Sequence, residues 1–133
     1  MNILFFLRPK SGVTYLTIGN SMRQGLEKMK ASGHTEVPVL NKDGTYAGTV
    51  SHGDFLWKIL EKDFTDMQMA EHEKIDPLVS KKTSPVRINT TMEDLLTKAA
   101  DQNFVPVVDD FDSFVGIVTR RDIIKYFASK NIN

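Results

Sequence analysis

The segment "VPVVDDFDSFVGIVTRRD", Val105 to Asp122, decides the fold, because the chain contains this pattern twice. The earlier segment "VPVLNKDGTYAGTVSHGD", Val37 to Asp54, aligns with it without a gap at a shift of 68 residues. Self-similarity of this kind indicates two copies of one structural unit. The identical pairs are Val37/Val105, Pro38/Pro106, Val39/Val107, Gly48/Gly116, Val50/Val118 and Asp54/Asp122.

Each copy has the pattern of a strand, a helix, two strands and a second helix. In the second copy Val86 and Ile88 alternate as in a short strand, and Thr90 or Thr91 precedes a helical apolar stripe. Two apolar strands follow, with the turn-forming "DDFD" between them. The sequence therefore predicts an α/β (α+β) fold of two β-α-β-β-α units. Each unit is small, so we expect the two to pack into one globule.

The repeat also predicts the domain boundaries. We expect a first unit over residues 1–60, a linker and lead-in over 61–79, and a second unit over 80–130. Within these ranges Ile75–Val79 is predicted to dock on the second unit, and Ile3–Leu7 to play the same part for the first.

Composition excludes several classes of protein. Lys plus Arg and Asp plus Glu both number 17, so the basic excess typical of a nucleic-acid-binding protein is missing. The longest apolar run, Ile3–Leu7, is far shorter than the about 20 residues that span a bilayer. There is no cysteine, and no histidine pair has helical ligand spacing. We expect a cytoplasmic protein without nucleic-acid, membrane or metal binding.

A short motif, Gly-x-Val-(Ser/Thr)-x-x-Asp, ends each copy at the junction of a strand and a helix. It reads "GTVSHGD" over Gly48–Asp54 and "GIVTRRD" over Gly116–Asp122. A hydroxyl residue followed three positions later by an acid is a common helix cap that needs no ligand. The same geometry also suits a ligand, because a helix N-terminus attracts phosphate and a carboxylate accepts both hydrogens of a cis-diol.

The duplicated pattern resembles a tandem pair of cystathionine-β-synthase (CBS) domains, also called a Bateman module. The likeness covers roughly Thr14 to Phe127, nearly the whole chain. It implies two units that pack through their sheets with pseudo-twofold symmetry and form two clefts. Clefts of this family commonly bind adenosine-containing ligands, namely AMP, ADP, ATP, S-adenosylmethionine or cyclic di-AMP.

The resemblance also implies which residues touch such a ligand. For ribose and phosphate these are Thr119, Asp122, Ser51 and Asp54, and the motif residues Arg120, Arg121 and His52 are further candidates for the phosphate. For the base they are Tyr15, Leu16, His34, Thr35, Val37, Pro38, Val86, Ile88, Asn103, Phe104, Val105 and Pro106. "TRRD" carries two arginines where "SHGD" carries none, so we expect the second copy to be the better phosphate site.

The predicted function is a regulatory adenine-nucleotide sensor that signals to a separate effector protein. It requires no cofactor and, since no activated nucleophile or acid–base pair is evident, is not an enzyme. Family modules of this kind pair through their helices, so a homodimer is expected, and Phe55 and Trp57 would mark its face if they were exposed. The alternative is a structural dimerisation module whose clefts are degenerate and empty.

Overall fold

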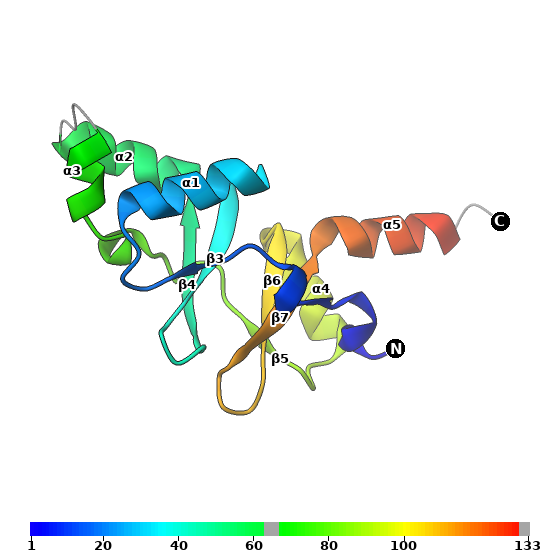
Figure 1. Ribbon diagram of the computed structural model, residues 1–133. Helices are drawn as coiled ribbons and strands as arrows, with labels where there is room; N and C mark the ends of the chain where they lie inside the picture. Colours follow the sequence, from blue (N-terminus) through cyan, green and yellow to red (C-terminus); the bar gives the residue numbers. More distant parts are fainter. Residues whose placement is uncertain (63–66, 131–133) are drawn as a thin grey trace. The chain divides into compact units, whose positions relative to one another are not determined.

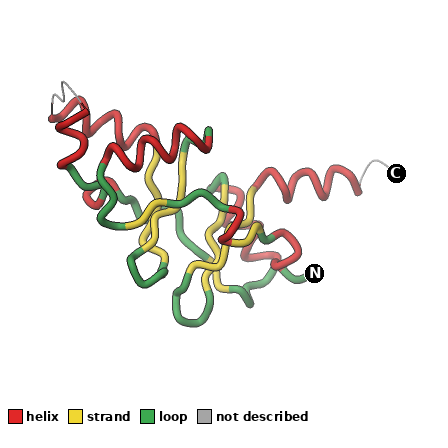
Figure 2. Tube along the Cα trace, viewed as in Figure 1, coloured by secondary structure: helices red, strands yellow, loops and turns green. Residues whose placement is uncertain are grey.

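A computed structural model describes residues 1–62 and 67–130 and divides the chain into two compact units (Figures 1 and 2). The first unit is Thr14–Lys82 and contains the first copy of the repeat. The second unit contains the second copy and is built from two parts of the chain, Met1–Val13 and Thr83–Asn133. Each unit combines a small sheet with helices, so the predicted α+β class is confirmed.

The first unit follows the predicted order of strand, helix, strand, strand and helix. Its sheet has the order β2-β3-β4, with β2 parallel and β4 antiparallel to the central β3. The elements are β2 (Leu16–Thr17), α1 (Met22–Ser32), β3 (Glu36–Leu40), β4 (Tyr46–Ser51), α2 (His52–Lys62), α3 (Met67–His72) and the short 3₁₀ helix η3 (Asp76–Leu78).

The second unit repeats this order and adds a strand from the N-terminal segment. Its sheet has the order β1-β7-β6-β5, in which β1 lies antiparallel to β7. The elements are the 3₁₀ helices η1 (Ile3–Phe6) and η2 (Lys10–Gly12), β1 (Arg8–Pro9), β5 (Val86–Arg87), α4 (Met92–Asp101), β6 (Phe104–Val108), β7 (Phe114–Thr119) and α5 (Arg120–Lys130).

The register of the strands confirms the alignment of the two copies. Val37 lies opposite Val50 in the first sheet, and Val105 lies opposite Val118 in the second. In both sheets the register shifts at the last pair of the Val-Pro-Val strand, at Val39/Leu40 and at Val107/Val108. The duplicated sequence therefore produces the same local irregularity twice.

Each unit has its own hydrophobic core between its sheet and helices. In the first unit the core includes Leu16, Val37, Val39, Val50 and Phe55, all at most 1% exposed. In the second unit the equivalent core residues include Val86, Val105, Val107, Val118 and Ile123. Alternate residues of the central strands thus point into the core, as expected for a sheet covered by helices on one face.

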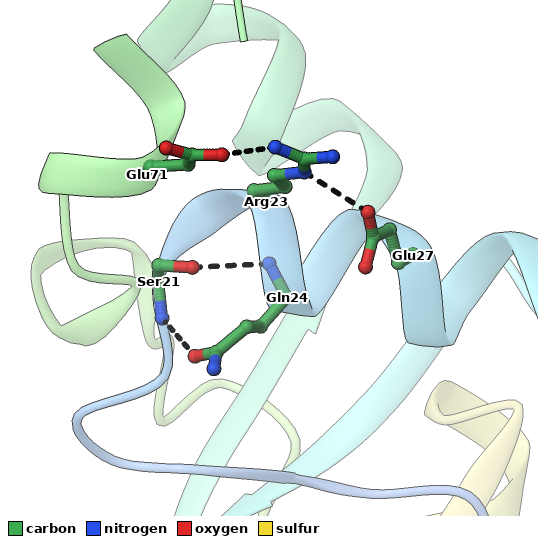
Figure 3. Close-up of polar contacts among 5 residues, drawn as sticks. All are labelled: Ser21, Arg23, Gln24, Glu27 and Glu71. Atoms are coloured by element: carbon green, nitrogen blue, oxygen red, sulfur yellow. Dashed lines mark hydrogen bonds and ion pairs between the residues drawn. The ribbon is translucent and has the colours of Figure 1, made fainter. Parts of the chain in front are cut away.

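The start of α1 shows how local sequence fixes a helix end (Figure 3). The Ser21 hydroxyl accepts a hydrogen bond from the Gln24 amide at 3.1 Å, and the Ser21 amide donates to the Gln24 side chain at 2.8 Å. This reciprocal capping box stabilises a helix by about 1 kcal/mol. Arg23 then contacts Glu27 in the same helix and Glu71 in α3, so α3 is tied to α1 by charge as well as by packing.

The lead-in segments dock opposite to the sequence-based prediction. The N-terminal segment adds β1 to the second unit, where Pro9 lies opposite Gly116 of β7. The later segment returns to the first unit, where Ser80 pairs with Thr49 of β4. Both approaches use a glycine, because a Cβ on Gly116 would lie 2.2 Å from the Arg8 carbonyl oxygen and one on Gly48 would lie 2.4 Å from that of Ser80. The predicted assignment of Ile3–Leu7 and Ile75–Val79 is therefore wrong.

Among the helices that the structure describes, none has the length and apolar character needed to cross a membrane.

Candidate functional site

The predicted motif lies in each unit where the last strand meets the last helix. In the second unit β7 ends at Thr119 and α5 begins at Arg120; in the first, β4 ends at Ser51 and α2 begins at His52. Each helix is anchored to the loop before the Val-Pro-Val strand. The His52 amide donates to the Thr35 carbonyl and the Arg120 amide to that of Asn103, both at 2.9 Å. The structure thus brings Thr35 and Asn103 to the motif.

At the second junction Thr119 caps the helix while Asp122 forms an ion pair. The Thr119 hydroxyl accepts a hydrogen bond from the Asp122 amide at 3.1 Å. The Asp122 carboxylate accepts two bonds from Arg8, one from Nε at 2.7 Å and one from Nη2 at 2.8 Å. Chiefly these bonds, helped by the Thr119 hydroxyl and by Lys125, lower the pKa of Asp122 despite partial burial. The carboxylate is therefore held in its ionised form.

At the first junction the equivalent acid closes a helix cap instead. The Ser51 hydroxyl accepts from the Asp54 amide at 3.2 Å, and one Asp54 oxygen accepts from the Ser51 amide at 2.8 Å and from its hydroxyl at 3.0 Å. This is the carboxylate form of the capping box that the sequence predicts. The cap interpretation is thus confirmed at both junctions, and at the second the acid also pairs with Arg8.

The Arg120 side chain is bonded to the end of α4 and to the loop that follows it. Its Nε donates to the Ala99 carbonyl at 2.7 Å, its Nη2 to the Ala100 carbonyl at 3.3 Å, and its Nη1 to the Asn103 side chain at 3.2 Å. The guanidinium therefore satisfies carbonyl groups at the C-terminal end of α4, which lack helical partners. Its neighbour Arg121 is exposed and makes no side-chain bond to the described residues.

The residues predicted for the base pocket fall into two groups. Several are buried parts of the fold: Leu16 and Val37 belong to the first core, Val86 and Val105 to the second with Ile88 packed against it, and Pro38, Phe104 and Pro106 are buried in the central strands. Others remain accessible, namely His34, Thr35 and Asn103, while Tyr15 is half-buried with the Lys28 ammonium 5.5 Å from its ring centre. The accessible group is the one that flanks the two junctions.

A hollow of about 330 Å³ lies beside Asp54 in the first unit. Its lining includes Trp57, Lys58 and Glu61 of α2 together with Pro77 and Leu78 of η3. Two carboxylates and one ammonium face this space, so its side-chain charge is negative. A negative hollow is unfavourable for a phosphate group.

Arg8 is the functional candidate that sequence reasoning missed. The signal for it lies in a further part of the repeat, since Ile3–Arg8 corresponds to Ile75–Ser80 at a shift of 72 residues. In both segments a 3₁₀ helix is followed by a residue whose carbonyl approaches the motif glycine, Arg8 at Gly116 and Ser80 at Gly48. The lead-in thus places position 8 at the second junction and position 80 at the first.

Comparison with known proteins agrees with this architecture. The CBS domain family model matches residues 7–61 and 75–129. A crystal structure of CbpB in complex with cyclic di-AMP is 28% identical with a TM-score of 0.88, over 97% of this chain and 85% of that one. CbpB from Streptococcus agalactiae is 29% identical with a TM-score of 0.82, over 93% and 78%.

A relative known by its sequence shows a similar likeness. MJ1426 of Methanocaldococcus jannaschii, an uncharacterized protein, is 28% identical over an alignment 127 positions long, and the match covers 74% of this chain and 74% of that one. The family match spans most of the sequence, and its two ranges coincide with the two copies of the repeat. The chain therefore belongs to the CBS domain family and carries two CBS domains in tandem.

Proposed function

We propose that this protein is a regulatory module that binds an adenosine-containing nucleotide and signals to a separate partner protein. The observation that carries the proposal is the second junction, where an ionised acid, a capping hydroxyl and a helix N-terminus occur together. The c-di-AMP complex of the CbpB relative supports a nucleotide as the ligand class. AMP, ADP, ATP, cyclic di-AMP and S-adenosylmethionine all carry the adenosine unit that such a site would recognise.

Asp122 would accept the ribose hydroxyls and Thr119 would lie beside the sugar or phosphate oxygens. A carboxylate offers about four acceptor positions, and the two bonds from Arg8 leave room for two hydroxyl donors. Arg121 is the exposed cation of the motif, and the exposed Asn103 flanks the junction, where its carbonyl accepts from the Arg120 amide. Recognition of a diol by an ionised carboxylate gives charge-assisted hydrogen bonds, which are stronger than neutral ones.

The two junctions are proposed to bind with unequal strength. Asp54 already accepts two hydrogen bonds from Ser51 and faces a hollow that also contains Glu61. Binding a diol there would have to compete with the helix cap, and binding a phosphate would meet negative charge. We therefore assign the stronger site to Thr119 and Asp122.

The assignment is tested by calorimetric titration of AMP, ATP and cyclic di-AMP into the wild type, Asp122→Ala and Asp54→Ala. We expect Asp122→Ala to weaken the tightest of these ligands at least tenfold, because it removes charge-assisted bonds of about 1.5–3 kcal/mol each. Asp54→Ala is the matched control, since it truncates the equivalent acid of the other copy and is expected to change that affinity less than threefold. Equal affinity in the wild type and Asp122→Ala would overturn the assignment.

Self-association is proposed to occur through α2. Leu56, Trp57 and Leu60 are 57%, 69% and 63% exposed and lie within about one turn of this helix, whereas Phe55 is buried in the core. An exposed apolar cluster of this size is typical of an interaction surface.

The same surface favours the second candidate function, a dimerisation module with empty ligand sites, as does the closed cap at Asp54. A wild type that binds none of the three nucleotides in calorimetry would favour that alternative.

A further inference from the structure

Arg8 is held at the second junction by the fold of the N-terminal segment. Pairing of β1 with β7 places Arg8 opposite Ile117, two residues before the helix cap. Its guanidinium then meets the Asp122 carboxylate through Nε and Nη2 at 2.7 and 2.8 Å. This arrangement leaves Nη1 outside the ion pair, and the Arg8 side chain remains 49% exposed. A fixed and accessible guanidinium therefore stands beside the acid that the proposed function assigns to ribose.

Of the two arginines in the motif, the structure fixes only Arg120, and its partners lie elsewhere. Arg120 donates all three of its observed bonds to the end of α4 and its loop, so its charge is committed there. Arg121 is exposed, and no bond to the described residues fixes the orientation of its side chain. A guanidinium that is already oriented loses less conformational freedom when it binds an anion.

We propose that Arg8 is the anion-binding and specificity-determining residue of the second junction, and that Asp122 positions it there. Arg8 would receive a phosphate oxygen of the nucleotide while Asp122 receives the ribose hydroxyls. The junction then selects phosphate-bearing nucleotides over the uncharged nucleoside. This inference rests on the proposed function, and Arg8 is the residue that gives the second junction its preference for phosphate-bearing ligands.

The charges around the two junctions support this selection. At the second junction Arg8, Arg121 and Lys125 accompany one acid, Asp122, and the Lys125 charge acts on that carboxylate. At the first junction Ser80 stands at the position of Arg8. The hollow there contains Asp54 and Glu61 with Lys58 alone as a cation. The two junctions thus carry opposite net side-chain charge, and only the positive second junction suits a phosphate.

The experiment measures the ratio of AMP to adenosine affinity by calorimetry in the full chain. In the wild type we expect AMP to bind more tightly than adenosine. Arg8→Ala and Arg8→Gln are expected to reduce the ratio about tenfold by weakening AMP, with adenosine changed less than twofold, because each removes one charge-assisted contact. Arg8→Lys keeps the charge and is expected to retain the ratio within about threefold. Circular dichroism checks that each variant is folded.

A matched control is Arg87→Ala, which removes another exposed Arg–Asp pair of the second unit. Arg87 Nη2 lies 3.2 Å from Asp112 near the hairpin, at the opposite end of β7 from the junction, so the ratio should not change. An unchanged ratio in Arg8→Ala and Arg8→Gln would overturn the role of Arg8 and leave the nucleotide site standing. Equal weakening of AMP and adenosine would also overturn it, because Arg8 would then act only through folding. A wild type that binds neither ligand would overturn this inference, whereas the proposed function falls only if ATP and cyclic di-AMP also fail to bind.

Discussion

At the scale of single residues, one difference between the copies gives the same acid two roles. Asp54 and Asp122 occupy equivalent positions in α2 and α5, yet Asp54 bonds to Ser51 while Asp122 bonds to Arg8. The cause lies outside the motif, because Arg8 stands where the other unit has Ser80. A guanidinium fork matches a carboxylate in geometry and charge, so Arg8 gives Asp122 a charged partner that Asp54 does not have among the described residues.

The Arg8–Asp122 pair makes a testable contribution to stability that depends on pH. Because the bonds from Arg8 lower the pKa of Asp122 in the folded protein, the pair stabilises the fold fully above the unfolded aspartate value of about 3.9. That contribution is lost as the pH falls through the lower folded pKa. We expect Asp122→Asn to lower the free energy of unfolding at pH 7 by about 1 kcal/mol or less, since both side chains are partly exposed.

The measurement is urea unfolding of the wild type, Asp122→Asn, Arg8→Ala and the double variant between pH 2 and 7. In the Arg8→Ala background the effect of Asp122→Asn should be smaller than in the wild type. A coupling free energy of zero at pH 7 would contradict a stabilising pair.

The site residues that depend on local sequence were predictable, and those that depend on distant segments were not. Ser51 and Thr119 are helix caps because a hydroxyl and an acid three residues apart act within one turn. The partner of Asp122 lies 114 residues away and arrives only when β1 docks on β7. The bonds of Arg120 to the end of α4 were likewise not predictable, because sequence spacing does not reveal that α4 ends beside it.

At the scale of elements, the lead-in segments depend on two glycines that admit a neighbouring backbone. A Cβ on Gly116 would lie only 2.2 Å from the Arg8 carbonyl oxygen, so any side chain at this position must displace β1. The strands and helices of each unit follow the hydrophobic period of the sequence and were predicted from it. Docking of the lead-ins was not, because an edge strand of two residues carries too little pattern to name its partner.

We expect Gly116→Ala to destabilise the second unit by about 2 kcal/mol, the usual effect of forcing a group into a filled space. Hydrogen exchange measured by mass spectrometry should show lost protection in β1 and β7 and unchanged protection in β4. Gly12→Ala is the matched control in the same segment, because a Cβ there meets no atom within 4 Å. Equal exchange in β7 of both variants would contradict the proposed clash.

At the scale of the whole molecule, duplication has kept the framework and changed the surfaces. Paired valines form both cores, Val37 with Val50 and Val105 with Val118, while the charged residues at the junctions differ. In α2 the apolar cluster Leu56, Trp57 and Leu60 is exposed. Exposing apolar surface to water has an unfavourable free energy, which is removed if a second copy of the chain covers the cluster. A symmetric dimer uses the same patch twice, so one substitution removes two contacts.

Trp57→Glu tests this association without disturbing the fold. Trp57 is 69% exposed, so the charge should leave the circular dichroism spectrum and the free energy of unfolding of the monomer nearly unchanged. Sedimentation velocity at increasing concentration should show a dimer for the wild type and at least tenfold weaker association for the variant, since buried tryptophans often contribute about 2 kcal/mol or more to an interface. Phe111→Glu is the control, because Phe111 is 83% exposed on the hairpin between β6 and β7 and should leave association unchanged. A wild type that stays monomeric at high concentration, or a variant that associates as tightly as the wild type, would show that α2 is not the interface.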